Sequence, residues 1–127
     1  MKNKIFLSYS YSDKQWVEQF AIALKKEGIG VWSAFQDIAL GENFTERIQS
    51  ALRASNTLVV LLSPNSVKSR GVFFELGAAI ADNKRIIPIV IDDVESGQLP
   101  LPLTKYQYMR ESSPVSAAKK VARAVKN

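Results

Sequence analysis

The segment from Leu58 to Leu62 restricts the possible folds more than any other part of this sequence. It reads Leu-Val-Val-Leu-Leu and is apolar at every position, without the alternation of a strand that has one face in water. An uninterrupted apolar run of this length suits the centre of a parallel sheet, because such a strand is covered on both faces. The chain is therefore expected to supply two layers of helices.

Strand and helix patterns alternate along the rest of the chain, as that architecture requires. Further strands are predicted at residues 5–7, 29–32, 86–91 and 106–109, and helices at 12–28, 43–52, 63–82 and 113–125. This alternation predicts an α/β fold with a mostly parallel sheet between two helical layers. Ligands of such folds bind outside the carboxyl ends of the strands. With a flavodoxin-like strand order, the hydroxyl-rich segments 8–13 and 63–66 would border that crevice.

Local signals predict where the helices begin and end. Ser12 and Gln15 have the spacing of a capping box, Gly28 is placed to end the first helix, and Ser63 precedes a proline as an N-cap would. A break in the helical region that follows Ser63 is expected near residues 69–71. In the last helix, the residues expected to face the core are Val115, Ala118, Val121, Ala122 and Val125.

Composition excludes several kinds of catalytic site. The 127 residues fit one domain, residues 1–127, and include no cysteine and no histidine. This removes Cys/His zinc sites, Ser-His-Asp triads and acid–base catalysis by histidine. The sequence also lacks a dinucleotide fingerprint and a G-x-x-x-x-G-K-[ST] loop. Asp92 and Asp93 are adjacent but have no further ligands in view, so no metal site is predicted.

The charge distribution bears on partners and location. The formal net charge is +5, and much of the excess lies in the last segment, which reads as a solvated helix face. No basic stripe is interleaved with aromatic residues, so this domain is not expected to bind nucleic acid. No run is long or apolar enough to span a membrane, and the first residues do not resemble a signal peptide. The expected location is the cytoplasm.

Glu75 is the residue that the pattern singles out. It is the only charged residue between Gly71 and Ala81, and it shares one helical face with Val72, Leu76 and Ala79. A carboxylate inside an apolar face should be partly desolvated, which raises its pKa. The alternative is that Glu75 reaches solvent or caps a broken helical turn.

Other polar and aromatic residues carry weaker signals. Asp13 most simply supports the positive N-terminus of the first helix, and Asp37 most simply serves loop geometry. Trp32 ends a strand at the ligand-binding edge, although core packing would explain it as well. Tyr9 and Tyr11 read as surface or loop-packing residues.

The order of these motifs resembles the TIR (Toll/interleukin-1 receptor) domain family over essentially the whole chain. Residues 6–10, Phe-Leu-Ser-Tyr-Ser, followed by Asp13, resemble the first box of the family. Residues 28–44 resemble its second strand and its BB loop, here residues 33–42. Residues 55–66 are similar to its third strand and exit, and residues 72–76 to the segment that carries the catalytic glutamate in NAD-cleaving members. The style is closer to bacterial and archaeal members than to animal adaptors.

The resemblance implies a flavodoxin-like three-layer sandwich with about five mostly parallel strands in the order 2-1-3-4-5. In many members it also implies cleavage of NAD, as substrate and without a further cofactor, to nicotinamide and ADP-ribose or a cyclic isomer. Glu75 matches the catalytic glutamate, and Trp32 matches an aromatic residue that stacks near the nicotinamide. The other residues expected to bind the substrate are Ser8, Tyr9, Ser10, Asp37 and Phe44. One departure is Gly71, where the family frequently has tryptophan.

The chemistry of NAD cleavage suits a chain without histidine or cysteine. Nicotinamide leaves as a neutral molecule from a cationic pyridinium, so no general acid is needed, whereas ordinary glycosides use two carboxylates. A single carboxylate can stabilise the developing oxocarbenium charge and hold the ribose hydroxyls. Attack by water or by another part of NAD then decides between a linear and a cyclic product.

Three functions therefore follow from the sequence. The first is an NAD glycohydrolase that self-association activates in prokaryotic immune defence, with a sensor domain or partner protein upstream. The second is a non-catalytic module that assembles through TIR–TIR contacts of the BB loop. The third is a related nucleotide N-glycosidase, which would act on nucleosides or nucleotide monophosphates instead of NAD.

Overall fold

The computed structural model describes residues 4–33, 40–41, 44–91, 94–99 and 106–126. Within these residues, one parallel sheet has the strand order β2-β1-β3-β4-β5, which confirms the flavodoxin-like prediction. The strands are β1 (Lys4–Ser8), β2 (Gly30–Trp32), β3 (Thr57–Leu62), β4 (Arg85–Val90) and β5 (Met109–Arg110).

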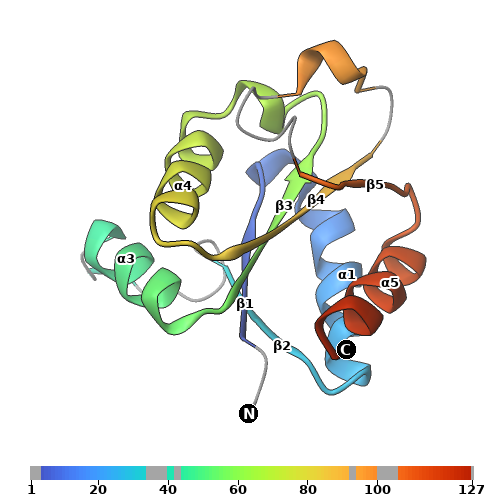
Figure 1. Ribbon diagram of the computed structural model, residues 1–127, viewed down its shortest axis with the longest axis horizontal. Coiled ribbons are helices and arrows are strands. Elements are labelled where there is room, and N and C mark those ends of the chain that lie inside the picture. Colours follow the sequence, from blue (N-terminus) through green and yellow to red (C-terminus); the bar gives the residue numbers. More distant parts are fainter. Residues whose placement is uncertain (1–3, 34–39, 42–43, 92–93, 100–105, 127) are drawn as a thin grey trace.

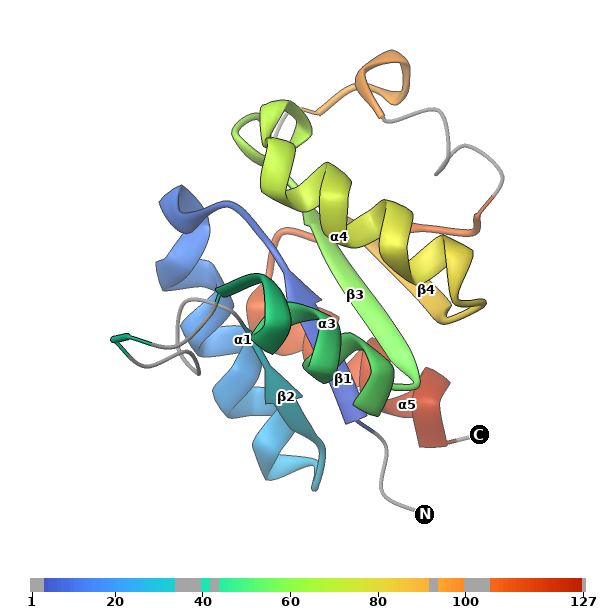
Figure 2. The same cartoon turned by 90° about the vertical axis from the view of Figure 1, so that its left-hand side faces the viewer.

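Helices cover both faces of the sheet (Figure 1). Helices α1 (Lys14–Lys26) and α5 (Pro114–Lys126) pack together on one face, and α3 (Phe44–Ala54) and α4 (Arg70–Ala81) lie on the other. Figure 2 shows α3 and α4 in front of β3, with α1 and α5 behind the sheet. The described residues also form the short 3-10 turns η1 (Tyr11–Asp13), η2 (Ser66–Lys68) and η3 (Ser96–Gln98). No helix in the described ranges is long and apolar enough to cross a bilayer.

Strand β3 divides its side chains between two apolar cores. Val59 and Leu61 enter the core under α1 and α5, whereas Leu58, Val60 and Leu62 enter the core under α3 and α4. All six residues of β3 are buried, as an apolar run without alternation predicts. Strand β1, its neighbour, alternates in the same way. In β1, the side chains of Ile5 and Leu7 therefore enter the core under α1 and α5, and that of Phe6 enters the core under α3 and α4.

Proline is tolerated inside β4 because β5 is short. Pro88 is registered opposite Val60 of β3, but β5 pairs only with Ile89 and Val90. On its β5 side, β4 is therefore an edge strand at Pro88, and edge strands are where proline is accommodated in sheets.

Two predicted helix starts are wrong. Helix α1 is preceded by η1, and its N-cap is Asp13, not Ser12; the Asp13 side chain makes no capping hydrogen bond. Helix α4 begins at Arg70 after Ser69, whose Oγ accepts from the N–H of Val72 at 3.3 Å. The predicted break near residues 69–71 is thus confirmed, but Ser63 is not an N-cap. The prediction for Gly28 is confirmed by its φ of +82°, which suits a glycine at a helix end.

The prediction that Val115 of α5 faces the core is also wrong. Val115 is 49% exposed and lines a groove of about 280 Å³ together with Ile22 of α1. Ala117, which was not predicted, belongs to the buried face and turns that face away from Val115. The other four predicted residues are buried.

Candidate functional site

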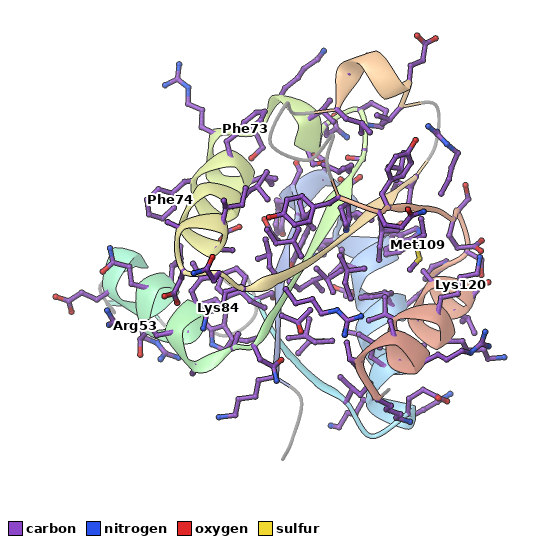
Figure 3. The ribbon with its side chains drawn as sticks, in the orientation of Figure 1. Arg53, Phe73, Phe74, Lys84, Met109 and Lys120 are labelled. Carbon is purple, nitrogen blue, oxygen red and sulfur yellow. The ribbon has the colours of Figure 1, made fainter. Side chains whose placement is uncertain are left out.

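The site is built around Glu75 on the sheet-facing side of α4. The buried residues of this helix are Val72, Glu75, Leu76 and Ala79, the same four that helical spacing places on one face. Glu75 itself is 8% exposed. Its two neighbours before it in the chain, Phe73 and Phe74, point away from the sheet (Figure 3). The alternative that Glu75 reaches solvent is therefore wrong.

Ser8 is the hydrogen-bond partner of Glu75. Its hydroxyl donates to Glu75 Oε1 at 2.7 Å, and Ser8 is fully buried. Ser8 is the last residue of β1, and alternation along this strand puts Phe6 and Ser8 on the face covered by α3 and α4. The carboxylate therefore lies at the carboxyl end of a central strand, the edge at which ligands of parallel α/β folds bind.

Two opposing effects act on the charge of Glu75. Burial raises the pKa of its carboxyl group from the ordinary value of 4.5 to about 7, and the Ser8 hydrogen bond partly opposes that rise. At neutral pH the group is consequently divided between its neutral and ionised forms. Titratable groups shifted in this way by burial are typical of functional sites.

A second set of hydrogen bonds joins the loops that follow β1 and β3. Ser63 Oγ donates to Asp13 Oδ2 at 2.5 Å, across the point where the strand order reverses. Ser66 Oγ donates to the carbonyl of Leu61 at 2.6 Å and accepts from the N–H of Ser63 at 2.8 Å. These contacts fix the segment that leads into α4. The sequence placed both loops at the crevice but did not predict their hydrogen bonds.

Asp13 thus has a different partner from the one expected. Its carboxylate binds Ser63 of the other loop, and its side chain does not cap α1. The two residues are 50 positions apart, so only the strand order brings them together. The feature of the sequence that indicated a polar contact here is the hydroxyl-rich composition of residues 63–66.

Trp32 lies on the same side of the sheet as Glu75. It is half-buried at the end of β2, its ring packs on Phe6 with centroids 5.0 Å apart, and the Arg47 guanidinium lies 5.8 Å from the ring centroid. Trp32 also lines a cavity of about 440 Å³ between β2 and the second half of α3, where Ala51 is among the lining residues. Its packing on Phe6 bears out the core-packing reading of this residue, while its role toward a substrate stays a prediction.

The remaining predicted site residues are not all brought to Glu75. Tyr9 is buried in the core under α1 and α5, on the opposite side of the sheet. Ser10 is half-buried in the loop after β1, where its carbonyl accepts from the N–H of Asp13. Asp37 lies outside the described residues, and Phe44 begins α3 without a described side chain.

Gly71 has free space around it at the start of α4. A Cβ built there would meet only Ser69 Oγ, at 3.8 Å, which is ordinary van der Waals contact. Alanine has a higher helix propensity than glycine. Gly71→Ala should therefore raise the free energy of unfolding by about 0.5–1 kcal/mol, as measured by urea denaturation. Gly28→Ala is the matched control and should lower it, since Gly28 has a φ of +82°. A destabilised Gly71→Ala protein would show that the first turn of α4 is packed differently.

Comparison with known proteins gives the same family as the motifs. The family model of the TIR domain matches residues 5–124. A protein named "Probable 2′ cyclic ADP-D-ribose synthase TcpO", from Methanobrevibacter olleyae, is 32% identical over 107 residues. These cover 76% of this chain and 31% of that protein. The NAD(+) hydrolase TcpC of Escherichia coli is 30% identical over 90 residues, which cover 66% of this chain and 29% of that protein.

The fold is also similar to solved structures. The TIR domain of a Toll-related receptor from Hydra magnipapillata superposes with a TM-score of 0.81 at 24% identity, covering 97% of this chain and 98% of that one. The family model, the sequence relatives and the strand order agree. The chain belongs to the TIR domain family.

Proposed function

We propose that this domain is an NAD glycohydrolase in which Glu75 is the catalytic carboxylate. The observation that carries the proposal is the position of Glu75, buried at the carboxyl end of β1 and hydrogen-bonded to Ser8. Two sequence relatives with names of NAD-related enzymes support the same reading. Because the chain spans about a third of each relative, activity, substrate and activation of the whole protein are part of the proposal.

The proposed reaction breaks the bond between C1′ of the ribose and the nicotinamide nitrogen. The nitrogen keeps the bonding electron pair and leaves neutral, and positive charge develops on the ribose. The Glu75 carboxylate stabilises that charge, an effect that is stronger in a site shielded from water. A water molecule then adds its oxygen to C1′ and releases a proton, which gives ADP-ribose.

A cyclic product requires only a different nucleophile. If a hydroxyl group of the same ADP-ribose attacks C1′ in place of water, the hydroxyl proton is released and a ring closes. One relative is named as a cyclic ADP-ribose synthase and the other as an NAD hydrolase, so both outcomes are within the proposal. Chromatography of the product with authentic standards distinguishes them. Release of a base from nucleotide monophosphates, with NAD left intact, would indicate the N-glycosidase function instead.

Nicotinamide release is the test of the proposal. Wild-type protein is expected to release nicotinamide from NAD, and Glu75→Gln is expected not to do so.

We place this activity in the cytoplasm of a prokaryotic cell and in immune defence, with activation through self-association. Ser10, Trp32, Asp37 and Phe44 remain the residues proposed to contact the substrate. Tyr9 is withdrawn from that set because it is buried on the opposite side of the sheet.

An assembly module is the second candidate, and one residue of the BB loop favours it. Leu40 is fully exposed, next to Gly41, whose φ is +86°. An exposed leucine is available for burial against another copy, and burying one stabilises a contact by about 1.5–3 kcal/mol. Such a contact is compatible with the enzyme as well, since Leu40 is not among the residues proposed to bind the substrate.

Leu40→Asp should therefore weaken self-association by roughly tenfold or more, measured by sedimentation at high protein concentration. Asn56→Asp is the matched control, because it adds the same charge at an exposed position next to β3 and away from the BB loop. Equal association of the two variants would exclude Leu40 from the contact.

A further inference from the structure

Ser8 presents a polar group at the end of a buried apolar run in β1. Ile5, Phe6 and Leu7 precede it in β1, and all four residues are buried. The Ser8 hydroxyl faces the core under α3 and α4, and Glu75 Oε1 accepts its hydrogen bond at 2.7 Å. A hydroxyl without a partner in such a place would destabilise the fold, and alanine would fill nearly the same space. The bond to Glu75 is therefore what the hydroxyl contributes.

The environment of Glu75 gives that bond a defined effect. A buried carboxylate is driven toward its neutral form, and a hydroxyl that donates to it favours the ionised form. Burial and Ser8 are the two causes of the shifted pKa of Glu75. The charged residues on and beside the flanking helices are Glu46, Arg47 and Arg53 of α3, Arg70 of α4 and Asp82, which follows α4; none of them is one of those two causes. Strand β3 has no charged residue, and Lys4 lies at the opposite end of β1.

We propose that Ser8 is a positioning residue for Glu75: its hydroxyl orients the carboxylate within an apolar core and favours its ionised form. The consequence of this hydrogen bond for turnover rests on the proposed function, but the effect of Ser8 on Glu75 does not. Ser8 was expected to line the substrate pocket. The geometry instead assigns its hydroxyl to the catalytic carboxylate.

The effect on Glu75 can be measured without any substrate. Protein labelled with ¹³C at the glutamate side-chain carboxyl is titrated by NMR, and the Glu75 signal is assigned by its absence in Glu75→Gln. Since a hydrogen bond to a charged group contributes about 1.5–3 kcal/mol, Ser8→Ala should raise the pKa of Glu75 by about one unit or more. An unchanged midpoint would overturn the proposal.

A matched control separates this effect from a general loss of buried hydroxyls. Ser55 is also buried, and its Oγ donates to the carbonyl of Ala51 at 2.7 Å, next to the end of α3. Ser55→Ala should leave the Glu75 titration unchanged. Melting curves of the two variants show whether each is folded, and a Glu75 midpoint that shifted equally in both would also contradict the proposal.

The pH dependence of nicotinamide release tests the consequence for turnover. In Ser8→Ala, the rising part of the profile should move to higher pH, with a loss of about fivefold at pH 7 for a shift of one unit and recovery above about pH 9. A loss that persists at high pH, with an unshifted profile, would mean that Ser8 acts on the substrate. If wild type releases no nicotinamide while the NMR midpoint still shifts, the proposed function fails and the role of Ser8 toward Glu75 stands.

Discussion

Glu75→Gln is expected to reduce nicotinamide release from NAD by at least about a hundredfold. Glutamine keeps the size of the side chain and can accept the hydrogen bond from Ser8, so the variant removes the negative charge and little else. Loss of one preorganised group that stabilises transition-state charge costs about two to three orders of magnitude in rate. The measurement is kcat/KM for NAD, with nicotinamide quantified by chromatography.

The pH dependence of kcat/KM also tests whether the ionised form of Glu75 is the active one. With a pKa of about 7 for Glu75, wild-type kcat/KM should rise through neutral pH and level off above it. Glu46→Gln is a control that removes an exposed carboxylate from the first turn of α3. It should retain the wild-type profile. Equal activity of Glu75→Gln and Glu46→Gln would remove Glu75 from the reaction.

The free energy of unfolding should include a pH-dependent contribution from Glu75. The pKa of Glu75 is raised from 4.5 in the unfolded chain to about 7 in the fold, so the folded state holds its proton more tightly. That contribution to stability is fully present below about pH 4.5 and is lost as the pH rises through 7. A shift of this size corresponds to about 3 kcal/mol, because one pKa unit is worth about 1.4 kcal/mol.

Comparison with Glu75→Gln isolates this contribution. Other titrating groups are the same in both proteins, so they cancel in the difference between the two free energies of unfolding. As the pH rises from about 4 to about 9, that difference should change by about 3 kcal/mol in favour of the variant. Urea denaturation at several pH values measures it. A difference that is constant with pH would mean that Glu75 is solvated in the fold.

The main features of the fold were predictable because they depend on local patterns. The apolar run of β3 indicated a strand covered on both faces, and its six residues are all buried. Glu75 was found for a related reason, since its spacing from Val72, Leu76 and Ala79 placed it on an apolar helical face. In both cases the periodicity of the backbone decides which side chains are buried.

The contacts of the site depend on strand order, which local patterns do not encode. Ser8 and Glu75 are 67 residues apart, and Asp13 and Ser63 are 50 residues apart. The proline after Ser63 predicts a helix cap there, but the Ser63 hydroxyl joins the loops after β1 and β3, and Ser69 caps α4. The family resemblance placed Tyr9 with Ser8 among the substrate-binding residues. The two side chains lie on opposite faces of the sheet, because the direction of side chains alternates along an extended chain.

The most direct test of the central claim is nicotinamide release from NAD at high protein concentration with a crowding agent, so that the domain can self-associate. Wild type and Glu75→Gln are compared in one experiment, with melting curves to show that both are folded. We expect release by the wild type and none above background by the variant. Equal release by both, or no release by assembled wild-type protein, would contradict the assignment of Glu75 as the catalytic group of an NAD glycohydrolase.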